Sequence, residues 1–338
     1  MQEPSHSHAA RRGHHHDQGH GHTHGTVDPA LLSTAQGISA VKWSLVILAI
    51  TAAVQVAVVL LTGSVALLAD TVHNIGDALT AVPLWIAFAY SWRPPTERYT
   101  YGFGRIEDLA GIAVVLTILL SALFAGYESV LRIVHPQTVT HLGAVAAAAL
   151  VGFLGNEAVA QLRIRTGKRI GSVALIADGH HARIDGFTSL AVLAGAVGVW
   201  LGFPLADPIV GLLIALAIMR IVWQSAKSVL SRAIDGVDPE IVDEIHEVLA
   251  KMPGVVEVTE TRVRWLGHRM LAEVNVAVPA GLSVEEGHAV AVEVRHQLLH
   301  HLEYLSDATV HVDPDTASGQ AHHHISEHQH DDLPVHSH

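Results

Sequence analysis

The sequence predicts an α-helical membrane protein with six transmembrane helices and a small cytoplasmic α+β domain of order αββαβ, ferredoxin-like in arrangement. The chain has 338 residues, of which 50% are hydrophobic and only 15% are charged. Its mean hydropathy is +0.35, as expected of a membrane protein with a soluble portion. This composition excludes a disordered protein and a nucleic-acid-binding protein.

Six apolar runs are long enough to cross a bilayer, which takes about 20 residues in a helix. They cover Val41–Leu61, Ser64–Tyr90, Leu109–Leu131, Leu142–Leu162, Val173–Leu201 and Asp207–Leu230. The chain then divides into a disordered His-rich cytoplasmic tail (1–40), a transmembrane domain (41–232), a cytoplasmic domain (236–314) and a second disordered His-rich tail (315–338).

Basic residues gather on one side of the predicted spans. Arg93, Arg98 and Arg105 separate the second and third spans, and Arg163, Arg165, Lys168 and Arg169 separate the fourth and fifth. The positive-inside rule therefore places both termini in the cytoplasm, and an even number of spans requires the same. We expect a multi-pass protein of a bacterial-type inner or plasma membrane.

The soluble pattern after Leu230 predicts five elements. Apolar residues at helical or alternating spacing predict helices at Pro239–Met252 and Val284–Leu302, and strands at Val255–Leu266, Met270–Val278 and Ala308–Val312. The first two strands form a hairpin around Gly267. His268 at its tip is expected to be exposed.

A fifteen-residue phrase occurs twice, 108 positions apart, as Gly63–Asp77 and Gly171–Asp185. Each copy places a histidine and an aspartate four residues apart: His73 and Asp77, then His181 and Asp185. On a helix this spacing puts both side chains on one face. The two copies run in opposite directions and lie near the middle of the bilayer, as in transporters built from inverted repeats.

Two imidazoles and two carboxylates suit a tetrahedral divalent ion such as zinc. The chain has no cysteine, so only His, Asp and Glu remain as candidate ligands. Ionisable groups at membrane depth usually mark a transport path, which predicts a metal transporter. The alternative is that each of the four side chains is a hydrogen-bonded packing residue of a helix bundle.

Three further charged residues flank this quartet. Asp70 and Asp178 precede the histidines by one turn, and each carboxylate either attracts cations and relays protons or accepts a structural hydrogen bond. Arg183 lies two positions after His181, a rotation of about 200°. We expect it to pair with an acidic residue of a neighbouring helix, either Glu157 or Asp108.

The paired motifs, the phrase Tyr101–Ala110, the six spans and the αββαβ tail resemble the cation diffusion facilitator family, from Lys42 to Pro314. The resemblance implies a homodimer that exports divalent metal, usually in exchange for protons, and needs no cofactor. It maps His73, Asp77, His181 and Asp185 onto the transport ligands and favours zinc, with cadmium, cobalt or iron as further candidates.

Some members of that family hold regulatory metal in the cytoplasmic domain. His288, His311 and Asp313 match part of that ligand set, whereas Thr259 and Asn275 replace two of its histidines. The resemblance therefore implies one weaker site at most. No Asp or His lies in Thr96–Arg105, so no metal site is expected in that loop.

Metal–proton exchange by alternating access is the predicted mechanism, since ligation requires deprotonated groups. One rival is an intramembrane zinc metalloenzyme, which needs an open coordination position and a general base. Another is a proton-driven exporter of a different solute. The tails hold fifteen of the 27 histidines, which either buffer metal for the transporter or bind it incidentally.

Overall fold

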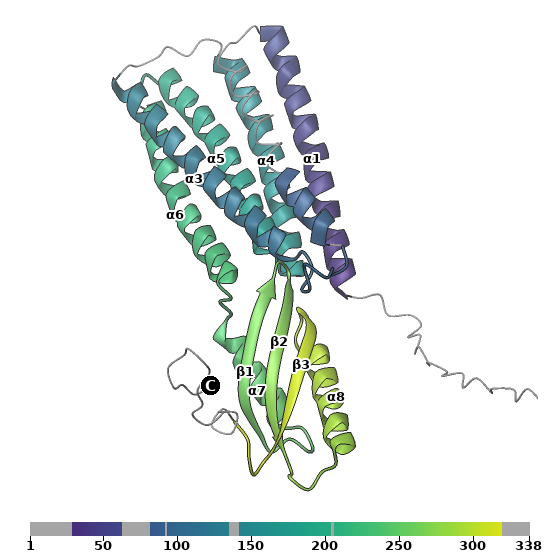
Figure 1. Ribbon diagram of the computed structural model, residues 1–338. Coiled ribbons are helices and arrows are strands. Elements are labelled where there is room, and N and C mark those ends of the chain that lie inside the picture. Colours follow the sequence, from purple (N-terminus) through teal and green to yellow (C-terminus); the bar gives the residue numbers. More distant parts are fainter. Residues whose placement is uncertain (1–28, 63–81, 92, 135–141, 204–205, 320–338) are drawn as a thin grey trace, which may run out of the picture.

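A computed structural model describes residues 29–62, 82–91, 93–134, 142–203 and 206–319. Figure 1 shows a bundle of long helices with a small sheet-and-helix domain at one end. Most of the predicted second span lies outside the described residues, and with it Asp70, His73 and Asp77. So do residues 1–28 and 320–338 of the His-rich tails.

In the described part of the chain, the bundle contains five long helices: α1 (Pro29–Thr62), α3 (Arg105–Val134), α4 (Leu142–Ile170), α5 (Val173–Trp200) and α6 (Ala206–Ala233). A shorter apolar helix, Val82–Ser91, represents the end of the second span. Within the described residues, α1, α3 and α6 are long and apolar enough to cross a membrane by length and composition. The bundle and the domain after it confirm the predicted fold class.

Two helices extend beyond the limits that hydropathy predicted. α1 begins at Pro29, so residues 29–40 are helical and not part of the disordered tail. Proline is favourable in the first turn of a helix. Further along α1, Ala40 and Val41 are buried against the bundle. α4 continues to Ile170, eight residues past Leu162, because a fall in hydropathy marks the end of an apolar run and not the end of a helix.

Glycines bring α4 and α5 into close contact. A Cβ atom on Gly179 of α5 would lie 2.7 Å from Cγ1 of Ile164, and one on Gly167 of α4 would lie 2.8 Å from Cγ1 of Ile176. Small residues let membrane helices approach until backbone meets backbone. The facing side chains of α4 and α5 are therefore held at short range.

The C-terminal domain has the predicted order αββαβ: α7 (Pro239–Ala250), β1 (Glu257–Leu266), β2 (Arg269–Val278), α8 (Val284–His301) and β3 (Leu305–Pro314). β1 pairs antiparallel with β2, and β2 pairs parallel with β3. A parallel pair needs a crossover connection, which α8 provides.

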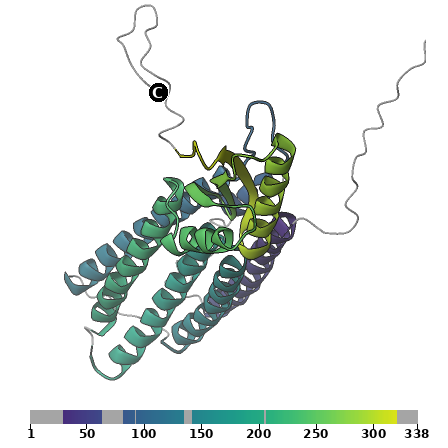
Figure 2. The same cartoon turned by 90° about the horizontal axis from the view of Figure 1, so that it is seen from below.

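One face of this sheet is apolar and the other is polar. Met270, Ala272, Val274 and Val276 alternate along β2 toward the core that the helices complete with Ile245, Leu249, Val294 and Leu298. The intervening residues Glu273 and Asn275 face away from the helices, as the two-residue period of a strand requires. In Figure 1 the β1–β2 hairpin points its tip at the helix bundle, and the view from below in Figure 2 places the domain over that end.

Candidate metal centre

His181 and Asp185 lie one turn apart on α5, on the same helix face. Nδ1 of His181 is 3.7 Å from Oδ1 of Asp185, and the two residues are 1% and 6% exposed. The shared face is the one that the four-residue spacing predicts. The other predicted ligands, His73 and Asp77, lie outside the described residues, so the convergence of all four stays a prediction.

The pair is well inside the bundle. His181 follows the start of α5 by eight residues, a distance of about 12 Å at 1.5 Å per residue. The nearer end of α5 is the one beside the C-terminal domain (Figure 1). An imidazole and a carboxylate at this depth are two ligands that zinc commonly takes.

Asp178 lies between this pair and the C-terminal domain and contacts an arginine. Oδ2 of Asp178 is 2.9 Å from Nη1 of Arg163 on α4. Asp178 is fully buried and Arg163 is 1% exposed. Two roles were considered for Asp178: a carboxylate that attracts cations or relays protons, and a carboxylate that fixes helix packing through an N–H or hydroxyl partner. Arg163 is a partner of the second kind, although the two groups form an ion pair and not an aligned hydrogen bond.

A second ion pair joins the same two helices away from the buried His–Asp face. Arg183 of α5 donates from Nη2 to Oε1 of Glu157 at 2.8 Å and from Nε to Oε2 at 3.0 Å. This confirms the predicted pairing of Arg183 and selects Glu157 over Asp108. The pair is partly exposed, in contrast with Arg163 and Asp178.

Polar groups continue beyond Asp185, away from the C-terminal domain. Gln55 of α1 and Ser189 of α5 are both buried. Both approach Gly152 of α4, where an added Cβ would lie 3.0 Å from Gln55 Nε2 and from Ser189 Oγ. Buried polar side chains therefore flank His181 and Asp185 on both sides along α5. Sequence patterns did not single out Gln55 or Ser189, because lone polar residues are common in membrane helices.

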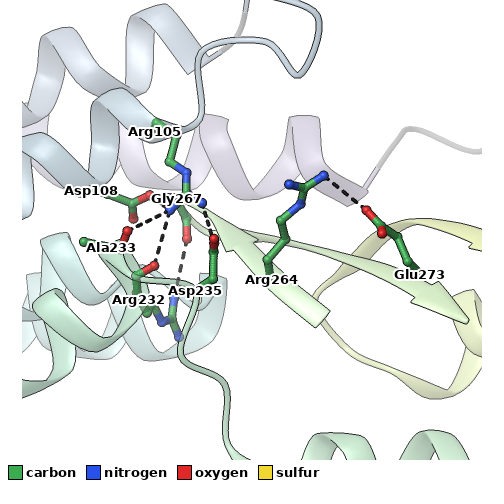
Figure 3. A network of polar contacts seen from close by, with 8 residues as sticks. All are labelled: Arg105, Asp108, Arg232, Ala233, Asp235, Arg264, Gly267 and Glu273. Atoms are coloured by element: carbon green, nitrogen blue, oxygen red, sulfur yellow. Dashed lines mark hydrogen bonds and ion pairs between the residues drawn. The ribbon is translucent and has the colours of Figure 1, made fainter. Parts of the chain in front are cut away.

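Figure 3 shows a polar network at the junction of bundle and domain. Arg105, the first residue of α3, donates to the carbonyl oxygens of Arg232 and Ala233 at the end of α6 (3.3 and 3.4 Å) and pairs with Asp235. The backbone N–H of Gly267 donates to Oδ2 of Asp108 at 3.3 Å. The hairpin tip is thus bonded to the end of α3.

His268 at the hairpin tip is buried, so the expectation of an exposed side chain was wrong. Its Nδ1 lies 2.6 Å from Oε2 of Glu107 on α3, and its Nε2 lies 3.1 Å from Oγ1 of Thr34 on α1. The local sequence of the hairpin predicts an exposed tip. In the structure the tip instead contacts α3 and α1, at residues more than 150 positions away in the chain.

Within the described residues, His288 does not lie with His311 and Asp313, the other predicted ligands of the weaker cytoplasmic metal site. Nε2 of His311 is 2.9 Å from Oδ1 of Asp313, but His288 is exposed on α8. His311 lies beside Asn275 on the sheet face opposite the helices, which separates it from His288. Across the residues that the structure covers, no three His, Asp or Glu side chains are grouped to hold a metal.

Comparison with protein families gives the class of the protein: a multi-pass membrane transporter of metal cations. The family model "Cation efflux transmembrane domain" matches residues 41–232, and the model "Cation efflux protein, cytoplasmic domain" matches residues 237–315. The chain belongs to the cation diffusion facilitator family. It is therefore a divalent metal cation efflux transporter and not an enzyme.

Named relatives are similar over most of their length. The "Probable cation efflux system protein Rv2025c" of Mycobacterium tuberculosis is 56% identical over 86% of this chain and 87% of its own. The magnetosome protein MamB of Paramagnetospirillum magneticum is 27% identical over 77% and 88%. The manganese efflux system protein MneP of Bacillus subtilis is 24% identical over 74% and 87%.

Proposed function

We propose that the chain exports zinc from the cytoplasm in exchange for protons, by alternating access around His181, Asp185 and the repeat-related His73 and Asp77. The observation that carries the proposal is the burial of an imidazole and a carboxylate one turn apart inside α5. Buried ionisable groups at membrane depth are costly and are usually retained for function.

The ligand types support zinc over manganese. Imidazole nitrogen suits zinc, whereas carboxylate and carbonyl oxygens suit manganese. MneP is named for manganese efflux, so manganese is the natural competitor. Cadmium and cobalt, like zinc, bind well to nitrogen ligands and would compete with zinc more strongly than manganese does.

Proton coupling follows from the same ligands. Imidazole binds metal only when neutral, and a carboxylate binds it far better when ionised, so protons and metal compete for the site. Histidine ordinarily titrates near pH 6.5. Metal would load from the neutral cytoplasm and leave toward a more acidic exterior. The proposal includes both termini in the cytoplasm and a homodimer joined through the cytoplasmic domain.

A competition assay tests this function. Full-length protein in liposomes with an imposed pH gradient is given radioactive zinc together with unlabelled manganese, cadmium or cobalt. We expect cadmium and cobalt to reduce zinc flux, a tenfold excess of manganese to leave most of it, and collapse of the gradient to slow it. Zinc flux insensitive to the gradient would exclude proton exchange. An intramembrane zinc metalloenzyme, or an exporter of another solute, would give no gradient-driven zinc flux.

A further inference from the structure

The strongest feature outside the His–Asp pair is the ion pair between Arg163 and Asp178. The two charged side chains are almost completely buried in the bundle. Nε and Nη2 of Arg163 and Oδ1 of Asp178 have no hydrogen-bond partner in the described parts of the chain. In a buried ion pair the attraction offsets the cost of desolvation only when the geometry is good and further hydrogen bonds are made. The charged groups of Arg163 and Asp178 lie 2.9 Å apart.

The backbone of α4 and α5 fixes where this pair lies. A Cβ on Gly179, the residue after Asp178, would be 3.1 Å from Cβ of Arg163. The arginine stem is thus pressed against α5. Asp178 precedes His181 by three residues, so the two share one helix face and lie about 4.5 Å apart along the axis. The ion pair is the charged contact adjacent to His181 on the side of the cytoplasmic domain.

Electrostatics makes this position sensitive to a passing cation. A divalent ion attracts a carboxylate twice as strongly as a guanidinium does at the same distance. It also repels the guanidinium. A divalent ion that approaches His181 from the cytoplasmic side can therefore displace Arg163 from Asp178, whereas a monovalent ion has no such advantage.

We propose that Arg163 and Asp178 form an electrostatic latch on the cytoplasmic approach to His181 and Asp185, which the transported divalent cation opens by displacing the guanidinium from the carboxylate. The latch rests on the proposed function, because it presumes that metal reaches His181. Arg163 acts as a positioning residue through Asp178. It also keeps the carboxylate neutralised between transport cycles.

The latch predicts opposite effects from neutralising its two partners. Initial zinc flux is measured in everted vesicles against zinc concentration at the cytoplasmic face. Arg163→Gln removes the competing cation, so KM should fall about tenfold, or about 1.4 kcal/mol, while kcat falls because release slows. Asp178→Asn leaves an unneutralised cation, so KM should rise about tenfold. A purely structural ion pair predicts changes of KM in the same direction, or none.

Arg183 and Glu157 provide a matched control, since they form an ion pair between the same two helices. Arg183→Gln and Glu157→Gln should each change KM by less than about twofold. If Arg163→Gln fails to accumulate, the double variant R163Q/D178N is compared with D178N, which shares its neutral residue 178. The latch requires a KM about tenfold lower in the double variant, and equal values would overturn it.

The outcome for the latch can be separated from that for the transport site. His181→Ala is measured in the same vesicles. Normal zinc flux in His181→Ala would refute the transport site itself. Loss of flux in His181→Ala, together with KM changes of one sign for Arg163→Gln and Asp178→Asn, would refute the latch alone.

Discussion

Nδ1 of His268 lies 2.6 Å from Oε2 of Glu107, although the two residues belong to different domains and are 161 positions apart. A carboxylate only accepts hydrogen bonds, so in the neutral imidazole Nδ1 donates to Glu107. Nε2 then accepts a hydrogen bond from the hydroxyl group of Thr34. The cytoplasmic hairpin is therefore hydrogen-bonded to both α3 and α1, near their first turns. A movement of the domain would strain its contacts with both helices.

His268→Ala should weaken the attachment of the cytoplasmic domain. It removes both hydrogen bonds and leaves the buried carboxylate of Glu107 without this donor, a type of loss that costs about 1–3 kcal/mol. Thermal unfolding of the purified protein should shift to lower temperature, and amide exchange at residues 266–270 should accelerate. The exposed His246 contacts Thr261 of the same domain, so His246→Ala should leave the unfolding temperature and the amide exchange at residues 266–270 nearly unchanged. Equal effects of the two substitutions would contradict the docking role of His268.

Gly104→Ala should separate the hairpin from α3. A Cβ at this position would lie 2.7 Å from the carbonyl oxygen of Leu266, too close for either backbone to stay in place. We expect lower thermal stability and reduced zinc flux at normal membrane abundance. Gly281 is the matched control, because among the described residues an added Cβ would meet nothing within 4 Å beyond its chain neighbours. Gly281→Ala should behave like the unaltered protein.

Gly179→Ala should force α4 and α5 apart beside the ion pair. The new methyl group would lie 2.7 Å from Cγ1 of Ile164 and 3.0 Å from its backbone nitrogen. Overpacking of this kind typically costs about 1–3 kcal/mol, and the shift would also move His181 relative to α4. Zinc flux should fall at least tenfold, whereas Gly143→Ala at an open position of α4 should preserve it. Undiminished flux in Gly179→Ala would show that the close packing is not needed.

Ser283→Ala should loosen the first turn of α8. Ser283 caps this helix in a reciprocal capping box with Glu286, and loss of such a cap costs about 1 kcal/mol. Amide exchange in the first turn should accelerate about fivefold at neutral pH, because a free-energy cost of about 1 kcal/mol changes the opening equilibrium by about that factor. The hydrogen bonds from the backbone N–H and hydroxyl of Ser283 hold the pKa of Glu286 below its ordinary value of 4.5.

The pH dependence of that cap has a definite sign. A carboxylate with a lowered pKa in the folded protein stabilises it above the unfolded pKa, and this contribution disappears as pH falls through the folded pKa. The difference between Ser283→Ala and the unaltered protein should therefore shrink below about pH 4.5. A difference that grows on acidification would contradict the assignment of the capping box.

Local sequence patterns were sufficient for the elements and for part of the site. The periods of the apolar residues predicted all five elements of the cytoplasmic domain, and helix geometry predicted that Arg183 turns toward another helix, where Glu157 receives it. These features depend on contacts within a helix or strand, or on one neighbour.

The burial of His268 and Arg163 could not be predicted in this way. A histidine at a hairpin tip has no local signal for a pocket formed by α1 and α3. Arg163 was counted among the basic residues that flank a span, because the apolar run ends at Leu162 while the helix continues. In both cases the environment of the side chain is decided by contacts with other helices, which a local pattern does not contain.

Simultaneous recording of zinc and proton flux in proteoliposomes decides whether His181 holds the transported ion. The comparison is between His181→Ala and His180→Ala, whose imidazole is turned about 100° away on the same helix. We expect His181→Ala to abolish both fluxes and His180→Ala to keep both within about twofold of the unaltered protein, since only the first removes a ligand. Coupled zinc and proton flux that persists in His181→Ala would contradict the proposed metal centre.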